Sequence, residues 1–172
     1  MKYARGFTLM ELLIVITLIL IIAAITIPSL TKAKINANEA SAAGSLRAIN
    51  QAEVSYQAAF GGFADSLARL GGSGPCTKSA ETAFLLDDSL AGGVKSGYRF
   101  VAVGGNPATE ANTTNATGAA PVVFDKTGQR LFCTTDKNVI RADLNAGGST
   151  IPPDGQRCVR DSRPCSRRAP GG

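Results

Sequence analysis

Few of the 172 residues have side chains that enzymes use for chemistry. There is no His, which excludes His-containing catalytic triads and most catalytic zinc sites. The four Cys lack the C-x-x-C spacing of structural zinc sites, and they lie at positions 76, 133, 158 and 165. The composition therefore disfavours an enzyme, and we predict no catalytic, cofactor-binding or metal-binding residue.

The carboxylate in the most unusual place is Glu11, which lies at the start of a long apolar stretch. Residues 12–31 carry no charge, and as a helix they would span about 30 Å, the hydrocarbon core of a bilayer. A carboxylate inside such a segment costs about 2.5–3.5 kcal/mol on insertion scales, so it is usually kept for a partner. The alternative is an unpaired Glu11 that snorkels to water.

The charges that precede the apolar stretch orient it. Lys2 and Arg5 come before it, so the positive-inside rule puts the N-terminus in the cytoplasm and the rest of the chain outside. A cleaved secretory signal fits poorly, because the apolar run is long and residues 28–30 lead into more helix-compatible sequence without a small-x-small site. A membrane anchor fits better, apart from Glu11.

The segment Arg5-Gly6-Phe7-Thr8-Leu9-Met10-Glu11-Leu12-Leu13-Ile14-Val15 closely resembles the cleavage motif of type IV prepilins and type II secretion pseudopilins. The shared pattern is a short basic leader that ends in Gly, an aromatic residue, a Glu four positions later, about 20 apolar residues and a Pro near their end. The resemblance is strong over residues 1–60 and weak beyond them. It supports a structural subunit and not an enzyme.

The resemblance implies roles for individual residues. A prepilin peptidase would cut between Gly6 and Phe7 and methylate the new amine of Phe7. Glu11 would pair with the N-terminal ammonium of Phe7 in the neighbouring subunit and so set the register of a helical homo-oligomer. Pro28 would kink or loosen the stem, or make an inert bend at the membrane surface. The precursor would wait in the bacterial inner membrane before assembly into an extracellular pilus or a periplasmic pseudopilus.

Beyond Pro28 the apolar pattern narrows to one stripe, which predicts an amphipathic helix that continues the stem to Phe60. The expected stripe is Ala33, Ala37, Ala40, Ala43, Leu46, Ile49, Ala52 or Glu53, Tyr56 and Phe60. The expected organisation is a leader over 1–6, a membrane or filament-core helix over 7–28, its amphipathic continuation over 29–60, a head over 61–150 and a basic tail over 151–172.

The head is expected to be an antiparallel sheet that covers the stem, which gives an α+β fold, the roll of pilin heads by resemblance. Runs rich in β-branched and aromatic residues predict strands at 98–103, 121–125, 129–134 and 139–142. Turns at 125–128 and 136–138 would join the last three. Short helices are expected over 66–70 and 79–91. Residues 104–120, which include sequons at Asn112 and Asn115, are expected to form an exposed loop.

The cysteines all follow the apolar segment, on the side where disulfides persist. One pairing joins Cys158 to Cys165 across a short loop and leaves Cys76 for Cys133, and this is the pairing we favour. The family resemblance instead implies that Cys133 pairs with Cys158 or Cys165. Either arrangement would stabilise a small core, typically by 2–4 kcal/mol.

The net charge of +5 is confined to the ends of the chain. The leader carries two positive charges and the Arg-rich tail a net three, so residues 7–153 are neutral. The tail has too little apolar content to pack, so we expect it to be solvated. The alternative is that its arginines form an electrostatic surface for DNA, polysaccharide or another acidic partner. The tail lacks the interleaved aromatics that would favour nucleic-acid binding, so nucleic acid is a disfavoured partner but not an excluded one.

Three functions are compatible with these features. The first is a filament subunit used in adhesion, motility or a related surface function, with a secretion pseudopilin or minor pilin as the variant. The second is a membrane-anchored adhesin whose stem never polymerises. The third, electron transport through stacked aromatics, is weakly supported because no stem aromatic lies between Phe7 and Tyr56.

Overall fold

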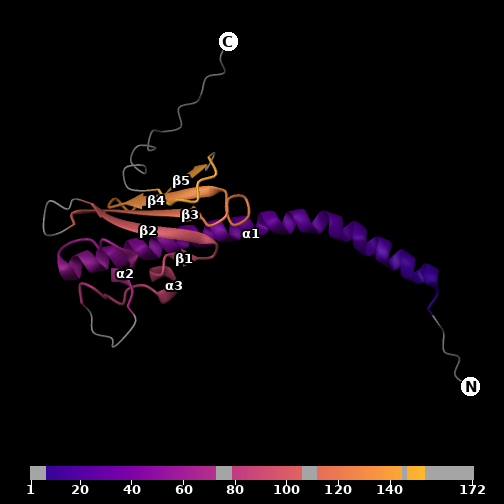
Figure 1. The fold of residues 1–172 in the computed structure, drawn as a ribbon, viewed down its shortest axis with the longest axis horizontal. Coiled ribbons are helices and arrows are strands. Elements are labelled where there is room, and N and C mark those ends of the chain that lie inside the picture. The colour runs from indigo at the N-terminus through magenta and orange to yellow at the C-terminus, as the bar shows by residue number, and fades with distance from the viewer. Residues whose placement is uncertain (1–6, 73–78, 106–111, 145–146, 154–172) are drawn as a thin grey trace, which may run out of the picture. The chain divides into compact units, whose positions relative to one another are not determined.

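The computed structural model describes residues 7–72, 79–105, 112–144 and 147–153. The chain divides into two compact units, residues 1–34 and residues 35–172, and each is described by itself below. The predicted α+β architecture is confirmed: a long N-terminal helix is followed by an antiparallel sheet (Figure 1).

The helix α1 (Leu9–Phe60) has 52 residues and contributes to both units. It ends where Gly61 takes the left-handed conformation (φ 80°), which glycine adopts without steric cost, and the Gly61 N–H donates to Gln57 O at 2.9 Å. The first unit holds the apolar part of α1, the one helix within the described residues long and apolar enough to cross a membrane, with a mean hydropathy of 2.9. Its side chains pack against nothing within their own unit.

Pro28 does not interrupt α1, which is assigned as helix on both sides of it. Proline has no backbone N–H to donate to the preceding turn. Nearby hydroxyls bond carbonyls of the same stretch: Thr26 donates to Ile22 O at 2.6 Å, and Thr31 donates to Ile27 O at 3.3 Å. The structure does not test the predicted kink, which stays a prediction.

The second unit contains a five-stranded antiparallel sheet in simple sequence order. Its strands are β1 (Val94–Lys95), β2 (Tyr98–Gly105), β3 (Thr114–Pro121), β4 (Arg130–Thr135) and β5 (Arg141–Leu144). Two short helices, α2 (Leu67–Leu70) and α3 (Asp88–Ala91), precede the sheet. The two edge strands are short. Strand β1 has two residues, and β5 has four residues, all of which are exposed.

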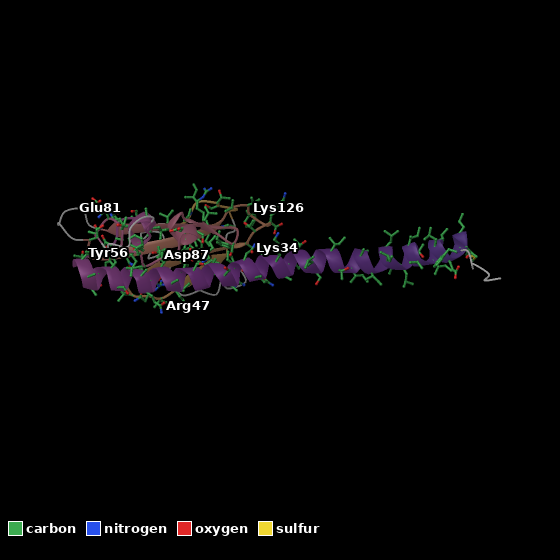
Figure 2. The ribbon with its side chains drawn as sticks, turned by 90° about the horizontal axis from the view of Figure 1, so that it is seen from below. Lys34, Arg47, Tyr56, Glu81, Asp87 and Lys126 are labelled. Atoms are coloured by element: carbon green, nitrogen blue, oxygen red, sulfur yellow. The ribbon has the colours of Figure 1, made fainter. Side chains whose placement is uncertain are left out.

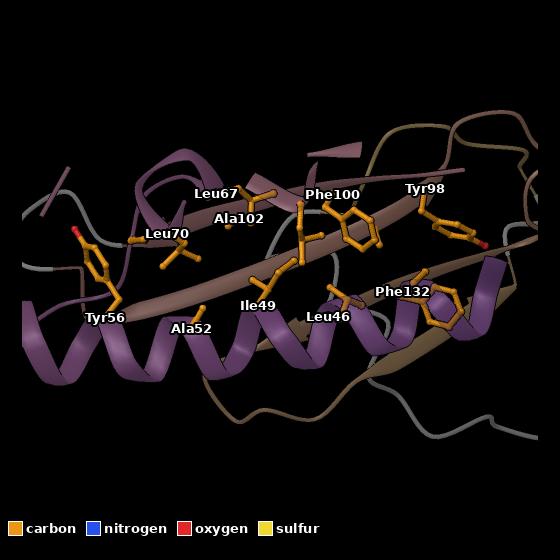
Figure 3. Packing of buried hydrophobic residues seen from close by; sticks show 14 of the residues in the cluster. Leu46, Ile49, Ala52, Tyr56, Leu67, Leu70, Tyr98, Phe100, Ala102 and Phe132 are labelled. Carbon is orange, nitrogen blue, oxygen red and sulfur yellow. The ribbon is translucent and has the colours of Figure 1, made fainter. Parts of the chain in front are cut away.

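The core of the head lies between α1 and one face of the sheet (Figure 3). Leu46 and Ile49 of α1 are fully buried, and Ala119 of β3 lies between Phe100 of β2 and Phe132 of β4 in the register of the strands. Because Ala119 carries only a methyl group, the larger side chains of α1 and of the flanking strands fill the space above it. The stem therefore supplies five of the fifteen described residues in the buried cluster of the head.

The central strand β3 is the main departure from the sequence predictions. The loop expected at 104–120 is wrong at residues 104–105, which end β2, and over residues 114–120, which pair with β2. Residues 116–119 also pair with β4. The strand expected at 121–125 is wrong beyond Pro121. Seven consecutive residues, 115–121, are buried. The small Thr, Ala and Gly residues of β3 give a weak strand signal, yet they allow the central strand to lie under a helix on one face and a chain segment on the other.

That covering segment is the stretch that follows β5. A Cβ added at Gly118 would lie 2.1 Å from Pro153 O, so Pro153 crosses β3 directly over this glycine. Gly118 is the cross-strand partner of Cys133, so the two residues face the same side of the sheet, away from Phe132 and the core.

The stripe of α1 was also partly mispredicted. From Leu46 to Tyr56 the expected apolar positions are buried. The prediction is wrong for Ala33, Ala37, Ala40 and Phe60, which are exposed, whereas Ile35 and Ala42 are buried. Alanines occur on every side of this part of the helix, so their positions could not define its buried face.

The segment between stem and sheet contains less helix than expected. Residues 66–70 do form α2, with Ser66 as N-cap, but of residues 79–91 only α3 is helical. Asp87 ends the irregular stretch by accepting a bond from Leu90 N at 2.7 Å, the usual role of an N-cap aspartate.

Candidate processing and assembly site

The residues singled out at the N-terminus gather at the first turn of α1. Phe7 precedes the helix and is almost fully exposed, Thr8 is its N-cap, and Glu11 is the acidic residue of the first turn. Gly6, Lys2 and Arg5 lie outside the described residues, so the geometry of the proposed scissile bond is not described.

Thr8 and Glu11 bond to each other reciprocally. The Thr8 N–H and hydroxyl both donate to Glu11 Oε2, at 3.2 and 3.1 Å, and the Glu11 N–H donates to Thr8 Oγ1 at 3.2 Å. This is a capping box, in which the side chains at the N-cap and three residues later satisfy N–H groups that the helix leaves free. Substituting such a cap by Ala typically costs about 1 kcal/mol.

The capping box fixes the position of the Glu11 carboxylate through one of its two oxygens. Both of its bonds use Oε2, and among the described residues no donor reaches Oε1. The carboxylate is thus held at the helix N-terminus, where the helix dipole favours a negative charge, while one oxygen is left for a donor from outside. An ammonium group is a suitable donor, because a charge-assisted hydrogen bond is about twice as strong as a neutral one.

Thr8 is the site residue that we did not single out from the sequence. The signal was present as Thr8-x-x-Glu11 just before an apolar run, which is the sequence pattern of a capping box. The resemblance directed attention to Gly6, Phe7 and Glu11 and left the residue that orients Glu11 unnoticed.

A second carboxylate occupies an unusual place in the head. Glu53 of α1 is 0% exposed; its Oε2 accepts the Ala64 N–H at 3.0 Å, and its Oε1 has no hydrogen-bond partner among the described residues. Burial raises the pKa of Glu53 to about 7, the negative charge of Asp65 acts in the same direction, and the bond from Ala64 opposes both.

Glu53 belongs to a buried polar band between α1 and the sheet. Asn50 Nδ2 donates to Thr134 Oγ1 at 3.0 Å, and Thr117 of β3 is the cross-strand partner of Thr134. Asn115, two residues before Thr117 on the same side of β3, is also buried, so a sequon expected on an exposed loop lies in the core instead. Asn112 of the other sequon donates to Phe63 O at 3.1 Å.

The cysteine predictions are largely untested. Cys133 is disulfide-bonded, and Cys76, Cys158 and Cys165 lie outside the described residues, so the pairing stays a prediction. Within the described ranges, no group of three or more His, Cys, Asp or Glu side chains could hold a metal ion. The tail beyond residue 153 is outside these ranges as well.

A capped, apolar N-terminal helix that continues into an α+β head defines a class of protein with a membrane-compatible stem and a globular domain built on its end. Residues 1–27 match the family described as the prokaryotic N-terminal methylation motif, and the chain therefore carries the type IV pilin and pseudopilin signature. This family consists of structural subunits and not of enzymes. No match was found among curated proteins or among solved structures.

Proposed function

We propose that this protein is a structural subunit of a type IV pilus-like filament. In the proposed sequence of events, the precursor is anchored in the inner membrane by α1, a prepilin peptidase cuts between Gly6 and Phe7 and methylates Phe7, and the stems then pack into a helical homo-oligomer. The observation that carries the proposal is the match to the methylation motif at the start of a helix whose apolar half packs against nothing within its own unit.

The first turn of α1 supports a specific role for Glu11 in assembly. The capping box fixes the carboxylate and leaves Oε1 without a donor, and cleavage after Gly6 would create an ammonium on Phe7 of each neighbouring subunit. In a low-dielectric bundle of stems such a charge is costly when it is unpaired, so subunits would assemble in the register that pairs it. Assembly into adhesive or motile pili is the leading use, and a pseudopilus or minor pilin is the variant.

Three substitutions separate the charge of Glu11 from its capping bond. Glu11→Gln keeps an oxygen that can accept from Thr8 and removes the charge, whereas Thr8→Val removes the hydroxyl and keeps the charge. Thr8→Ser is the matched control, because it keeps the hydroxyl. We expect Glu11→Gln to abolish surface filaments while the protein stays processed and stable, and Thr8→Ser to assemble normally.

The readouts are electron microscopy of sheared filaments and N-terminal sequencing of the mature chain. Mature protein that begins at N-methylated Phe7 supports the processing step, and an unprocessed Met1 start contradicts it. Normal filament formation by Glu11→Gln would show that the charge does not select the register. Thr8→Val tests the cap: we expect fewer filaments than with Thr8→Ser because the first turn frays.

The membrane-anchored adhesin is the second candidate. It requires a processed or unprocessed chain that never forms filaments, and the same shearing experiment distinguishes it, since the protein would then remain in the membrane fraction. The exposed apolar side chains of residues 9–27 fit both candidates, because either lipid or neighbouring stems would cover them, and the match to the methylation motif favours the filament.

A further inference from the structure

The head exposes large apolar side chains at one end of its sheet. Val123 and Phe124 are 44% and 38% exposed in the turn between β3 and β4, and Leu144 and Ile151 are 73% and 70% exposed in and after β5. We call these four residues the foot patch. Single exposed apolar residues are ordinary, but a contiguous group marks an interaction surface.

Contacts place these residues at the same end of the head. The Phe124 ring lies 3.5 Å from where a Cβ on Gly148 would be, which brings Gly148, three residues before Ile151, to the β3–β4 turn. Phe124 bridges Gly128, and Leu144 pairs with Arg130 two residues further on.

The turn that carries Val123 and Phe124 is firmly held, so its apolar side chains are displayed on an ordered support. The Asp125 N–H donates to Gly128 O at 3.0 Å, and the Thr127 hydroxyl bonds both the N–H and the carbonyl of Val123, at 3.1 and 3.0 Å. The Asp125 carboxylate accepts from Gln129 Nε2 at 2.6 Å, so this acid is already engaged.

Two side chains of α1 fix the turn to the beginning of the head part of the stem. Asn38 Nδ2 donates to Thr127 O at 2.9 Å, and Glu39 Oε1 accepts the Gln129 N–H at 2.8 Å. Glu39 also accepts the Arg130 N–H at 3.2 Å and lies 3.6 Å from its guanidinium. Figure 2 shows Lys126 at one end of the head and Glu81 at the other, so the foot patch lies far from the end at which α1 terminates.

The length of chain between this turn and the apolar segment is short. The charge-free stretch ends at Thr31, and Asn38 follows seven residues later, a path of about 10 Å as helix and about 25 Å at most if extended. Lys32 and Lys34 lie on this path, and Lys126 is at the tip of the turn. A lysine in the same turn as exposed apolar side chains, as Lys126 is, suits the headgroup layer, where anionic lipids attract cations and apolar groups reach the acyl chains.

We propose that the foot patch inserts into the headgroup–acyl boundary of an anionic bilayer while the precursor waits for assembly. The inference rests on the proposed function, because it needs α1 to be anchored in that bilayer. It adds a second membrane contact, made by the head itself, which must be broken when the subunit leaves the membrane.

The chain has no Trp, so the fluorescence of one introduced Trp reports on the surroundings of that single position. Phe124→Trp marks the foot patch, and Val103→Trp is the matched control, since Val103 is 42% exposed on β2 near the opposite end of the sheet. Leu20→Trp marks the apolar segment. Each full-length variant is reconstituted at low density in nanodiscs of phosphatidylglycerol and phosphatidylcholine, and quenching by brominated acyl chains and by aqueous acrylamide is measured.

We expect Trp at position 124 to emit at shorter wavelength than Trp at position 103, to be quenched by bromolipid and to be shielded from acrylamide. Adding Lys126→Glu should reduce the bromolipid quenching in phosphatidylglycerol discs and leave it unchanged in pure phosphatidylcholine. Equal acrylamide quenching at 124 and 103 overturns the proposal. So does shielding at 124 that appears only as the number of chains per disc rises, because the occupant is then a second copy.

The position-20 reporter separates this inference from the proposed function. If Trp at position 20 is quenched by deep bromine and Trp at position 124 is not, the chain is anchored and only the foot-patch contact fails. If Trp at position 20 is not quenched, the anchoring step of the proposed function itself fails.

Discussion

Glu11 and Glu53 show how one residue type serves opposite purposes along a single helix. Glu11 is at the exposed first turn, where two donors from Thr8 hold it and leave an oxygen for an outside partner. Glu53 is fully buried in the head, where its carboxylate accepts one hydrogen bond, from the Ala64 N–H. The first suits a charged group that forms an intermolecular bond, and the second suits a group that is protonated near neutral pH.

The buried position of Glu53 predicts a pH-dependent stability of the head. Its pKa is about 7 in the folded chain and 4.5 in an ordinary carboxyl, so between these values the folded state binds more protons than the unfolded state. The contribution of Glu53 to the free energy of unfolding should therefore be highest below pH 4.5, fall as the pH rises to about 7, and be flat above it. The fall should amount to about 3 kcal/mol.

Glu53→Gln should remove that dependence. A neutral amide can still accept the Ala64 N–H, so we expect the variant to unfold at a higher temperature than the native chain at pH 8 and at a similar temperature at pH 4.5. Thermal unfolding from pH 4 to 8 measures this, with the exposed Glu81→Gln as control. A Glu53→Gln variant that is less stable at pH 8 would mean that the carboxylate is favourably solvated.

At the scale of elements, the close packing of strand β3 on both faces depends on its small side chains. Gly118 has no side chain and the alanines around it have small ones, so residues 147–153 can lie directly on the outer face of the sheet. The same small side chains face α1 at Ala119, so β3 is covered on both sides. A strand in this position tolerates little added volume.

Gly118→Ala should displace the covering segment. The new Cβ would meet Pro153 O at 2.1 Å, so backbone must shift, and we expect a loss of about 1–3 kcal/mol in the free energy of unfolding. Hydrogen exchange should rise in residues 147–153. Gly44→Ala is the control, because nothing lies within 4 Å of its Cβ and an alanine inside a helix gains about 0.5–1 kcal/mol. Equal stability of the two variants would contradict the close contact.

The sequence was informative where physical patterns are strong. The stem, its end at Gly61 and the strands near 98–103 and 129–134 could be predicted from an apolar run, a C-terminal glycine and β-branched residues. The roles assigned to Phe7 and Glu11 from the shared motif stay predictions. Strand β3 could not be predicted, because its residues have weak strand preference and are ordered by the partners β2 and β4. The burial of Glu53 could not be predicted, because either Ala52 or Glu53 could continue the apolar stripe of α1.

At the scale of the whole molecule, one helix is shared by two units of different kinds. The first unit has apolar side chains with nothing in their own unit to cover them, and the second has a core to which α1 contributes Leu46, Ile49 and Tyr56. The head is therefore inseparable from its part of the stem, whereas the proposed function requires the apolar unit to exchange lipid for neighbouring stems.

Leu46→Ala tests this independence. Leu46 is fully buried, so we expect a loss of about 3 kcal/mol in the stability of the head. In detergent, the near-ultraviolet dichroism of Tyr98 and Phe132 should melt at lower temperature, while the helical signal of residues 9–34 persists. Leu20→Ala, at an exposed position of α1, should leave the melting of the head unchanged. Simultaneous loss of both signals would show a single cooperative unit.

The two edge strands of the sheet, β1 and β5, affect whether heads at high local concentration can aggregate by pairing their strands. Backbone groups along an edge strand can recruit another strand, and this is how cross-β aggregates grow. Here β1 offers two residues, and β5 offers four, among them Arg141 and Asp143, which cost free energy to desolvate in a stacked sheet. Heads brought into close proximity thus have little capacity to join edge to edge. The proposed polymerisation through helices would therefore meet little competition from amyloid-like growth.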